Sequence, residues 1–438
     1  RNRRLRVGGR SLLDSLAMSE ERDLQELAAL DRRLVAAVKG IKLLSAVSWP
    51  ARVQREYLER WHGGRVSLPE VEYPRFDFDG VRDEIDAIQQ VARLYGDHPV
   101  ADYIWRTAES SEIATRLLDA LGTPAVTEHS IRLFGRPGDT LPGAELHNID
   151  AARHFIFLAD ELSKELATHE ADYCLSAEIL QAELQEALDR FFVHHKVRVE
   201  IDPNLIAKAA AGPTRIRLRS ATAFSEYDRH QLLEHEAYVH SLTALNGREQ
   251  PHLTSLGLNT PRITATQEGL ATFAELITGT IDIGRMKRIS LRIIAIDMAL
   301  KGADYIDVFR FFLDSGQTES DSFTSAMRVF RGVPVTGGHA FTKDTVYLHG
   351  LLSVHTFFRW ALKNQRLKLV RYLFAGKMAL HDVLSLEPYF DSGWIAPALY
   401  IPHWVARANG LAGMLAFSLF ANRIRLDRVE AEDLVLGL

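Results

Sequence analysis

Cysteine is almost absent from this sequence, which has Cys174 alone among 438 residues. One thiol excludes an intrachain disulfide and argues against a cysteine-ligated metal, so a buried structural thiol in a helical segment is its expected role. No apolar run approaches the ~20 residues that are needed to span a bilayer. The net charge of −5 gives no global electrostatic case for binding nucleic acid or an anionic membrane.

The first residues, RNRRLR, lack the apolar core of a signal peptide. They begin with Arg1 rather than Met, which predicts a trimmed N-terminus. With 47% hydrophobic and 25% charged residues, the composition is that of an ordinary globular protein. We therefore expect a soluble, cytoplasmic protein with no nucleic-acid or membrane partner, and the sequence leaves its oligomeric state open.

What the sequence does contain is a set of metal-ligand residues in two short segments. His235, Glu236 and His240 lie in HEAYVH, and Glu268 lies in TQEGLA. A catalytic zinc takes three protein ligands plus a water, and two His with one Glu is a standard combination. The fourth residue, an unligated Glu, can accept the proton of the attacking water. The residues therefore predict a hydrolytic Zn²⁺ site with His235, His240 and Glu268 as ligands and Glu236 as general base.

The spacing of the two histidines predicts an irregular helix. The common motif H-E-x-x-H places them at i and i+4, whereas His235 and His240 are at i and i+5. On a regular α-helix the second imidazole would lie roughly 140° around from the first. Both reach one ion only if the helix has a π-bulge or unwinds near Val239, and π-bulges concentrate at functional sites. The alternative is a polar helix with two unrelated histidines, in which Glu268, in the first turn of the next helix, only complements the helix dipole.

The two segments HEAYVH and TQEGLA resemble those of the QEGLA-motif proteins, a bacterial family defined as a domain of unknown function. That family is similar to the eukaryotic microtubule-associated tyrosine carboxypeptidases, which remove the C-terminal tyrosine of α-tubulin. The resemblance runs from about residue 40 to residue 420 and includes the segments 245–247 (LNG) and 337–348 (GGHAFTKDTVYL). The chain is closer to the bacterial members, so tubulin is not implied as its substrate.

The resemblance implies the same assignment of the site as the residues do, with zinc on His235, His240 and Glu268 and with Glu236 as general base. It also implies a carboxypeptidase, whose substrate partner is the C-terminus of a peptide or protein.

Helical periodicity covers most of the chain, and it is clearest in residues 20–61, 79–96, 99–107, 109–121, 150–169, 174–193 and most of 286–386. The stretch 122–150 is rich in Gly and Pro and predicts a boundary between an N-terminal helical region, 1–145, and a catalytic domain, 146–438. One continuous domain is the alternative. The expected fold is α+β and mainly α-helical, with a zincin-like metallopeptidase core and a small β-sheet.

Two strands and a capped helix are expected just before the site. Residues 197–201 and 215–219 alternate apolar and charged side chains, as half-exposed strands do. Ser225 with Asp228 forms a variant capping box that opens the helix carrying HEAYVH. In zincin-type peptidases an edge strand pairs with the extended substrate, and Arg215–Arg219 is our candidate for it. The alternative is an ordinary sheet strand.

A carboxypeptidase needs a cation for the terminal carboxylate of its substrate and a donor for the developing oxyanion. The candidates for the cation are Lys343, Arg331 and Arg262, and Lys343 is preferred because it precedes Tyr347 by one helical turn. Tyr347 or His339 is the candidate for the oxyanion donor. The alternatives are a solvated or Asp344-paired lysine, a core tyrosine and an ordinary loop histidine.

Asp344 has an alternative role, because metal-bound imidazoles usually donate their second N–H to an outer partner. In that role, Asp344 would orient one of the liganding histidines.

These residues favour a zinc-dependent metallopeptidase of the carboxypeptidase type, in which Glu236 takes a proton from water and passes it to the leaving amine. One alternative is a non-catalytic regulatory or interaction protein with a structural metal, although a structural metal needs no base such as Glu236. Another is a metal-dependent amidohydrolase that acts on a non-peptide amide, which requires the same groups.

Overall fold

The computed structural model describes residues 12–166, 175–203, 205, 208–220 and 222–429. Within these residues the chain is mainly helical and has one three-stranded sheet, which confirms the α+β class. Cys174 and the RNRRLR segment lie outside the described residues.

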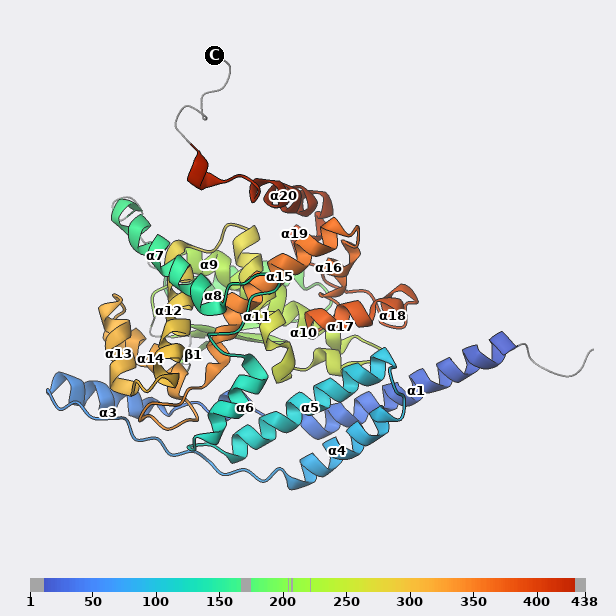
Figure 1. Cartoon of the computed structure of the whole chain (residues 1–438), viewed down its shortest axis with the longest axis horizontal. Coiled ribbons are helices and arrows are strands. Elements are labelled where there is room, and N and C mark those ends of the chain that lie inside the picture. Colours follow the sequence, from blue (N-terminus) through green and yellow to red (C-terminus); the bar gives the residue numbers. More distant parts are fainter. Residues whose placement is uncertain (1–11, 167–174, 204, 206–207, 221, 430–438) are drawn as a thin grey trace, which may run out of the picture.

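The N-terminal helices lie along the lower side of the molecule in Figure 1. They are α1 (Leu12–Val38), α2 (Leu43–Ala46), α3 (Ala51–His62), α4 (Asp79–Arg93), α5 (Pro99–Asp119) and α6 (Ala125–Phe134). One expectation was wrong here, because residues 99–119 form one helix rather than two. Helix α6 lies inside the breaker-rich stretch 122–150. Pro124 precedes α6 and Gly135 ends it, so these breakers bound a helix instead of excluding one.

One stretch, Glu20–His62, is long and apolar enough to cross a membrane by length and composition alone. It is divided among α1, α2 and α3, with non-helical residues between them. Its side chains Leu27 and Leu34 are fully buried in the protein. Core helices of soluble proteins pass the same test, so this stretch carries no argument for a membrane.

The sheet has three short strands, β1 (Arg198–Asp202), β2 (Ala209–Gly212) and β3 (Arg215–Arg219). Their order is β1-β3-β2, with β1 parallel and β2 antiparallel to β3. Both predicted strands are confirmed, but Arg215–Arg219 was wrong as the edge strand, because β3 lies in the centre. The edge toward the site is β2, whose sequence AAAG lacks the alternation of a half-buried strand.

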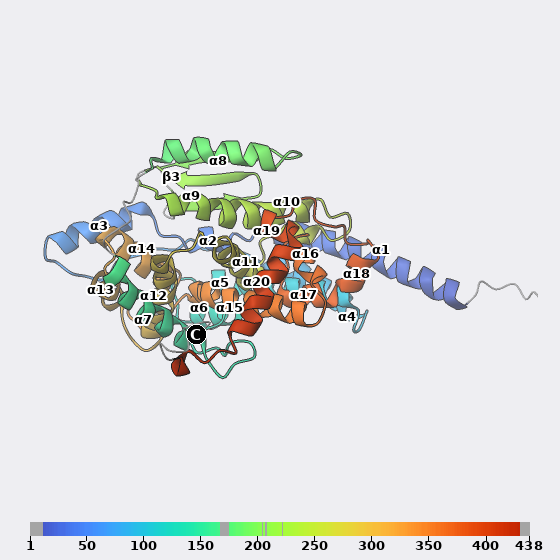
Figure 2. The ribbon, with the colours of Figure 1, turned by 90° about the horizontal axis from the view of Figure 1, so that it is seen from above.

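The sheet lies between two helical layers (Figure 2). Helix α8 (Ala177–Phe191) covers one face, and the site helix lies on the other; α7 (Asn148–Leu166) packs on α12 elsewhere in the molecule. The site helix runs through α9 (Glu226–Leu232), the π-helix η1 (Leu233–Ser241) and α10 (Leu242–Arg248). Its start confirms the predicted capping box, since Ser225 accepts from the Asp228 N–H and Asp228 accepts from the Ser225 N–H.

The rest of the chain is helical. Its elements are η2 (Thr254–Gly257), η3 (Pro261–Ile263), α11 (Thr264–Ile277), α12 (Ile283–Leu300), α13 (Tyr305–Asp314), α14 (Glu319–Phe330), η4 (Thr342–Thr345), α15 (Val346–Lys363), α16 (Lys368–Tyr372), α17 (Leu380–Ser385), α18 (Glu387–Asp391), α19 (His403–Ala406), α20 (Ala408–Ala421) and η5 (Leu426–Arg428). The segment 387–402, which follows the last stretch of predicted helical periodicity, contains the short α18.

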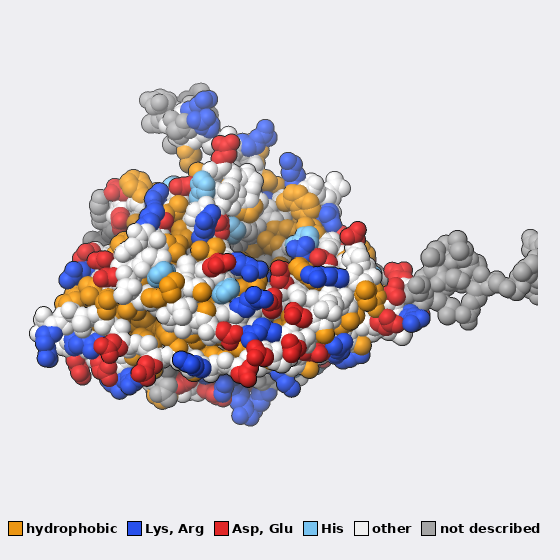
Figure 3. All heavy atoms as spheres, turned by 60° about the horizontal axis from the view of Figure 1, so that its bottom comes forward, with side chains coloured by type: hydrophobic (Ala, Val, Ile, Leu, Met, Phe, Trp, Pro, Cys, Tyr) orange, Lys and Arg blue, Asp and Glu red, His pale blue; other side chains and the backbone are white. Residues whose placement is uncertain are grey.

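A single apolar cluster joins the N-terminal helices to the site helices. It includes Leu34 of α1, Leu245 of α10 and Phe358 of α15, all fully buried. The domain boundary near residue 145 stays a prediction. On the face shown in Figure 3, basic and acidic side chains are intermixed rather than gathered into a field of one sign.

Candidate metal centre

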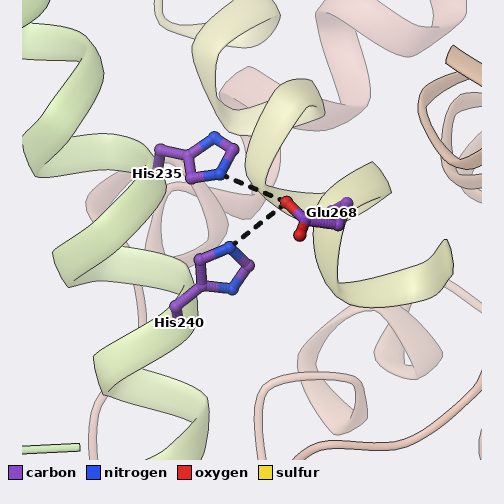
Figure 4. Close-up of side chains that lie close together, drawn as sticks. All are labelled: His235, His240 and Glu268. Atoms are coloured by element: carbon purple, nitrogen blue, oxygen red, sulfur yellow. Dashed lines mark ion pairs between the residues drawn. The ribbon is translucent and has the colours of Figure 1, made fainter. Parts of the chain in front are cut away.

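The helix that carries the two histidines is a π-helix over Leu233–Ser241, nine residues long. The prediction of an irregular helix from the i, i+5 spacing is therefore confirmed. Because a π-helix takes more residues per turn than an α-helix, His235 and His240 point to the same side (Figure 4). Their ring centroids are 4.8 Å apart.

Glu268 of α11 faces both imidazoles. Its Oε2 lies 3.4 Å from Nε2 of His235 and 3.6 Å from Nε2 of His240. These distances exceed those of good hydrogen bonds. They fit a shared ion instead, because ligand atoms bound at 2.0–2.1 Å in a tetrahedral site lie about 3.3 Å apart. The three ligand atoms all lie within 4.8 Å of one another, so the donor set fits a metal such as zinc.

The helix that carries Glu268 begins earlier than expected. Helix α11 starts at Thr264, after the 3₁₀ turn Pro261–Ile263, and has no acidic residue in its first turn. Glu268 is therefore in the second turn, and the expectation that it lies in the first turn was wrong. This weakens the alternative in which Glu268 serves the helix dipole, because that effect fades beyond the first turn.

The neighbours of Glu268 in the QEGLA segment fix the position of its helix. Gln267 accepts a hydrogen bond from the Thr243 hydroxyl of α10, 2.9 Å away. Gly269 lies against the backbone of Gly350 in α15, where an added Cβ would meet the Gly350 carbonyl carbon at 2.4 Å. Only glycine permits this close contact between α11 and α15. The segment therefore holds the ligand and also sets the spacing of the helices around it.

A second carboxylate, Glu275, supports His235 from behind. Its Oε1 lies 2.6 Å from Nδ1 of His235, so Nε2 is left to face Glu268. Arg285 donates to both oxygens of Glu275 at 2.8 Å, and Gln231 donates to Oε1 at 3.2 Å. This is the outer partner that liganding imidazoles usually have. The assignment of that role to Asp344 was wrong, since Asp344 is paired with arginines.

Sequence reasoning missed Glu275, although a signal was present. Glu275 follows Glu268 by seven residues, which places it two turns along on the same face of an α-helix. The partners Arg285 and Gln231 carry no comparable signal, because only the tertiary fold brings them to Glu275.

The charges of the site favour metal binding. Burial would lower the pKa of His235, but Glu268 and Glu275 raise it to about 10. Burial would raise the pKa of Glu268, but the charge of Lys343 and hydrogen bonds from the histidines hold it well below its usual range. Arg285 opposes burial in the same way and lowers the pKa of Glu275 to about 2. Both carboxylates are therefore ionised, whereas a metal ion must displace the proton of His235.

Replacing Glu275 with Gln should lower metal affinity by about 10- to 100-fold, because the imidazole loses its charged acceptor. Competition with a chelator of known affinity would measure the change, and circular dichroism would check the fold. Glu249→Gln is the matched control, because Glu249 contacts another imidazole, His195, at 3.1 Å. Unchanged affinity in Glu275→Gln would show that Glu275 does not position His235.

Glu236, the predicted base, lies between the two histidines in the π-helix and is half-buried. Its Oε2 accepts a hydrogen bond from the backbone N–H of Ala211 in β2, 3.1 Å away. Ser241, at the end of the same π-helix, donates to the carbonyl of Gly212 at 2.8 Å. Two hydrogen bonds thus hold the edge strand β2 against the π-helix that carries the histidines.

Lys343 and Tyr347 also reach the group. Lys343 is buried, and its Nζ donates to Oε1 of Glu268 at 2.7 Å and to the hydroxyl of Tyr347 at 3.1 Å. The two side chains therefore contact each other beside Glu268. Lys343 contacts the candidate ligand Glu268 itself, which leaves Lys343 less suited to hold a substrate carboxylate than expected.

The other predicted residues lie in different surroundings. Arg262 donates hydrogen bonds to both carboxylate oxygens of Asp382 and to the hydroxyl of Thr107. Arg331 is buried near Asp344, with Nη2 3.9 Å from Oδ1. His339 lies in the loop before η4, and no hydrogen bond or ion pair joins it to the group within the described part of the chain.

Comparison with known protein families matches residues 61–423 to the microtubule-associated tyrosine carboxypeptidases. The chain belongs to this family. No curated protein matches it. The match covers most of the chain, including the π-helix, β2 and α11. Membership of this carboxypeptidase family supports a peptide hydrolase that acts on a peptide or protein substrate, which agrees with the site.

Proposed function

We propose that this protein is a zinc-dependent metallocarboxypeptidase. The observation that carries the proposal is the convergence of two imidazoles and one carboxylate beside a half-buried glutamate and a sheet edge. Metal analysis of the purified protein, followed by mass spectrometry of a peptide library incubated with it, tests the proposal. Loss of single C-terminal residues supports it, whereas an intact library favours a structural metal.

His235, His240 and Glu268 would hold the zinc. The nature of the donors supports this metal, because two imidazoles and a carboxylate suit zinc among the common divalent ions. When bound, zinc supplies a Lewis acid for the scissile carbonyl and lowers the pKa of a water.

Glu236 is suited to move the proton. It lies in the same π-helix as His235 and His240, which belong to the metal-ligand group. Its own carboxylate accepts a hydrogen bond from the Ala211 N–H. A carboxylate beside the attacking water accepts its proton and delivers it to the leaving amine. The bond to Ala211 uses one oxygen and leaves the other to receive the proton.

The free edge of β2 is suited to bind the substrate backbone. The N–H of Arg219 donates to the carbonyl of Lys208 at 2.9 Å, so these two residues face each other in the β2–β3 ladder. Hydrogen-bonding directions alternate along an antiparallel strand, so Ala209 and Ala211 turn their backbone groups away from β3. The Ala211 N–H is already bonded to Glu236, so an extended peptide can pair by β-augmentation with the remaining groups, the N–H and carbonyl of Ala209 and the carbonyl of Ala211.

The order along the chain, with three strands, then the histidine helix and then the downstream glutamate, also supports a zincin-like core. In that arrangement, the substrate lies between β2 and the ligands.

A cluster of one buried and two half-buried arginines around Asp344 is the best receptor for the substrate's terminal carboxylate. Arg328 donates to both Asp344 oxygens at 2.6 and 2.7 Å, while Arg292 and Arg331 lie 3.6 and 3.9 Å from them. Three guanidinium groups therefore share one carboxylate. Within the described residues, Nε of Arg292 and of Arg331 has no hydrogen-bond partner.

Three arginines around one carboxylate leave this cluster with an excess of positive charge, which suits it to bind an anion. Burial and repulsion by Arg328 lower the pKa of both Arg292 and Arg331 to about 10. Tyr347 links the cluster to the metal-ligand group, because its hydroxyl lies 3.1 Å from Nζ of Lys343 and 3.4 Å from Nη2 of Arg328. A carboxylate bound here would relieve the repulsion and make charge-assisted hydrogen bonds.

Replacing Arg292 with Gln should raise KM for free-acid peptides and lower kcat/KM about 10- to 100-fold, since one charge-assisted bond is lost. Peptides amidated at the C-terminus should be poor substrates of both forms. Steady-state kinetics on a matched pair of peptides would measure this. Arg288→Gln, on the exposed side of the same helix, should behave like the unaltered enzyme. Equal cleavage of amides and acids would refute the carboxypeptidase assignment but leave a metal hydrolase.

A further inference from the structure

Lys343 is a buried cation next to the candidate metal ligands. Only 4% of the residue is exposed, although lysine is almost never fully buried unless its charge is paired. Its Nζ donates to Oε1 of Glu268 at 2.7 Å and to the hydroxyl of Tyr347 at 3.1 Å. A buried ammonium on a candidate metal ligand needs an explanation, because it places a positive charge beside a group of residues that suits a cation.

The pairing of Lys343 with Glu268 is enforced by the surroundings. The nearest carboxylate in the sequence is Asp344, but its two oxygens accept from Arg328 at 2.6 and 2.7 Å, and two further arginines lie beside it. Within the described residues, Glu268 is the carboxylate in ion-pair contact with Lys343. Breaking a buried ion pair leaves an uncompensated charge, which is strongly unfavourable. The ammonium therefore stays on Glu268.

The two oxygens of Glu268 consequently have different partners. Oε1 is held by the ammonium of Lys343, whereas Oε2 lies 3.4 Å from Nε2 of His235 and 3.6 Å from Nε2 of His240. Figure 4 shows a single oxygen of Glu268 joined to both imidazoles. A carboxylate can bind a metal through one oxygen or through both. Here the second oxygen already has a charged partner.

We propose that Lys343 is a positioning residue that restricts Glu268 to a single ligand atom, Oε2. This inference rests on the proposed metal site and gives a role to one of its neighbours. A carboxylate that binds through one oxygen occupies one coordination position fewer, and a catalytic zinc needs an open position. The ammonium also draws negative charge from the carboxylate, which leaves a bound ion a stronger Lewis acid.

Lys343 and Glu275 act on the ligands in opposite ways. Glu275 is an anion behind His235, with its Oε1 2.6 Å from Nδ1, and an anion in this place strengthens metal binding. Lys343 is a cation behind Glu268, and it repels the ion that the ligands hold. Removal of Glu275 should therefore weaken metal binding, whereas removal of the Lys343 charge should strengthen it. This difference in sign separates the proposed role from that of an ordinary support.

Lys343→Met tests the proposal, because methionine keeps a long flexible side chain and removes the charge. The variant should bind zinc about tenfold more tightly than the unaltered protein, since a like charge is lost and Oε1 is released. Competition with a chelator of known affinity would measure this. With Co²⁺ as the probe, visible absorption should weaken, because an ion with five ligands absorbs less than one with four. Turnover of a free-acid peptide should fall.

Lys287→Met is the matched control, because Lys287 pairs with Asp160 at 2.6 Å, and this carboxylate is outside the metal-ligand group. It should leave zinc affinity, the cobalt spectrum and turnover unchanged. Lys343→Arg keeps the positive charge and should keep the affinity and the cobalt spectrum of the unaltered protein.

Unchanged or weaker zinc binding by Lys343→Met overturns the inference, because the loss of a mere support weakens a site. Should this variant fail to fold, a crystal structure of the zinc-loaded unaltered protein decides the matter. Oε1 of Glu268 on Lys343 would support the inference, and Oε1 on the zinc would overturn it. If the unaltered protein takes up no zinc, the proposed function fails and this inference fails with it. If the unaltered protein binds zinc and hydrolyses peptides, a negative result for Lys343→Met overturns the inference alone.

Discussion

Glu236→Gln is expected to keep its metal and lose about 10²- to 10⁴-fold in turnover, the usual contribution of a general base. Gln has nearly the volume of Glu, and its amide oxygen can still accept from the Ala211 N–H that now binds Oε2 at 3.1 Å. The edge strand and the π-helix should therefore stay in place. What is lost is the only carboxylate that lies between the two liganding histidines in sequence.

The matched control is Glu234→Gln on the same π-helix. Residues two apart on a helix do not face one another, and burial raises the pKa of Glu234 to about 7. Glu234 is thus a partly buried carboxyl in the same element without a place in the ligand group. It should retain activity and metal.

Metal content by mass spectrometry and turnover of a free-acid peptide, measured on the same preparations, separate the outcomes. If Glu236→Gln hydrolyses peptides normally, the base is another residue. If it loses metal, Glu236 is a ligand or supports one.

His240→Ala is expected to lose metal and all measurable hydrolysis. Nε2 of His240 is one of three converging ligand atoms, 3.6 Å from Oε2 of Glu268. Its removal leaves two ligands, so affinity should fall by more than the 10- to 100-fold typical of losing an outer partner. Turnover should fall with metal occupancy and should not recover when excess zinc is added at micromolar concentration.

His230→Ala provides the control for this variant, because His230 is exposed and lies three residues before the π-helix begins. It removes an imidazole from the same continuous helix without touching the ligand group. A His240→Ala protein that keeps full metal and activity would place the ion elsewhere. A loss of both in His230→Ala would point to damage of the helix rather than of the site.

The sequence predicted the local features of the site better than its surroundings. The i, i+5 spacing was enough to predict an irregular helix, because two imidazoles at this spacing can share an ion only if the helix has a π-bulge or unwinds; the structure has a π-helix there. The Ser225 capping box and strands β1 and β3 also depend on neighbouring residues and were confirmed.

Features that depend on tertiary contacts were missed or misassigned. Strand β2 has no alternating pattern in its sequence, and it is held in place by pairing with β3 and by the Glu236 carboxylate. Both contacts come from other parts of the chain, so the sequence of β2 alone could not predict it. Asp344 precedes α15 closely enough to suggest a role near Lys343, but its partners come from α12 and α14. No spacing within one segment reveals which distant arginines will surround a carboxylate.

The contact between Gly269 and Gly350 has a consequence for how such chains are compared. Because neither glycine has a side chain, the two backbones touch and set the distance between α11, which carries Glu268, and α15, which begins just after Lys343. An alanine at either position would separate the helices by about the thickness of a methyl group and draw the ammonium away from the carboxylate. A chain could therefore retain every ligand and still have a site that is too open to work. Its integrity should be judged at these two glycines as well as at the histidines.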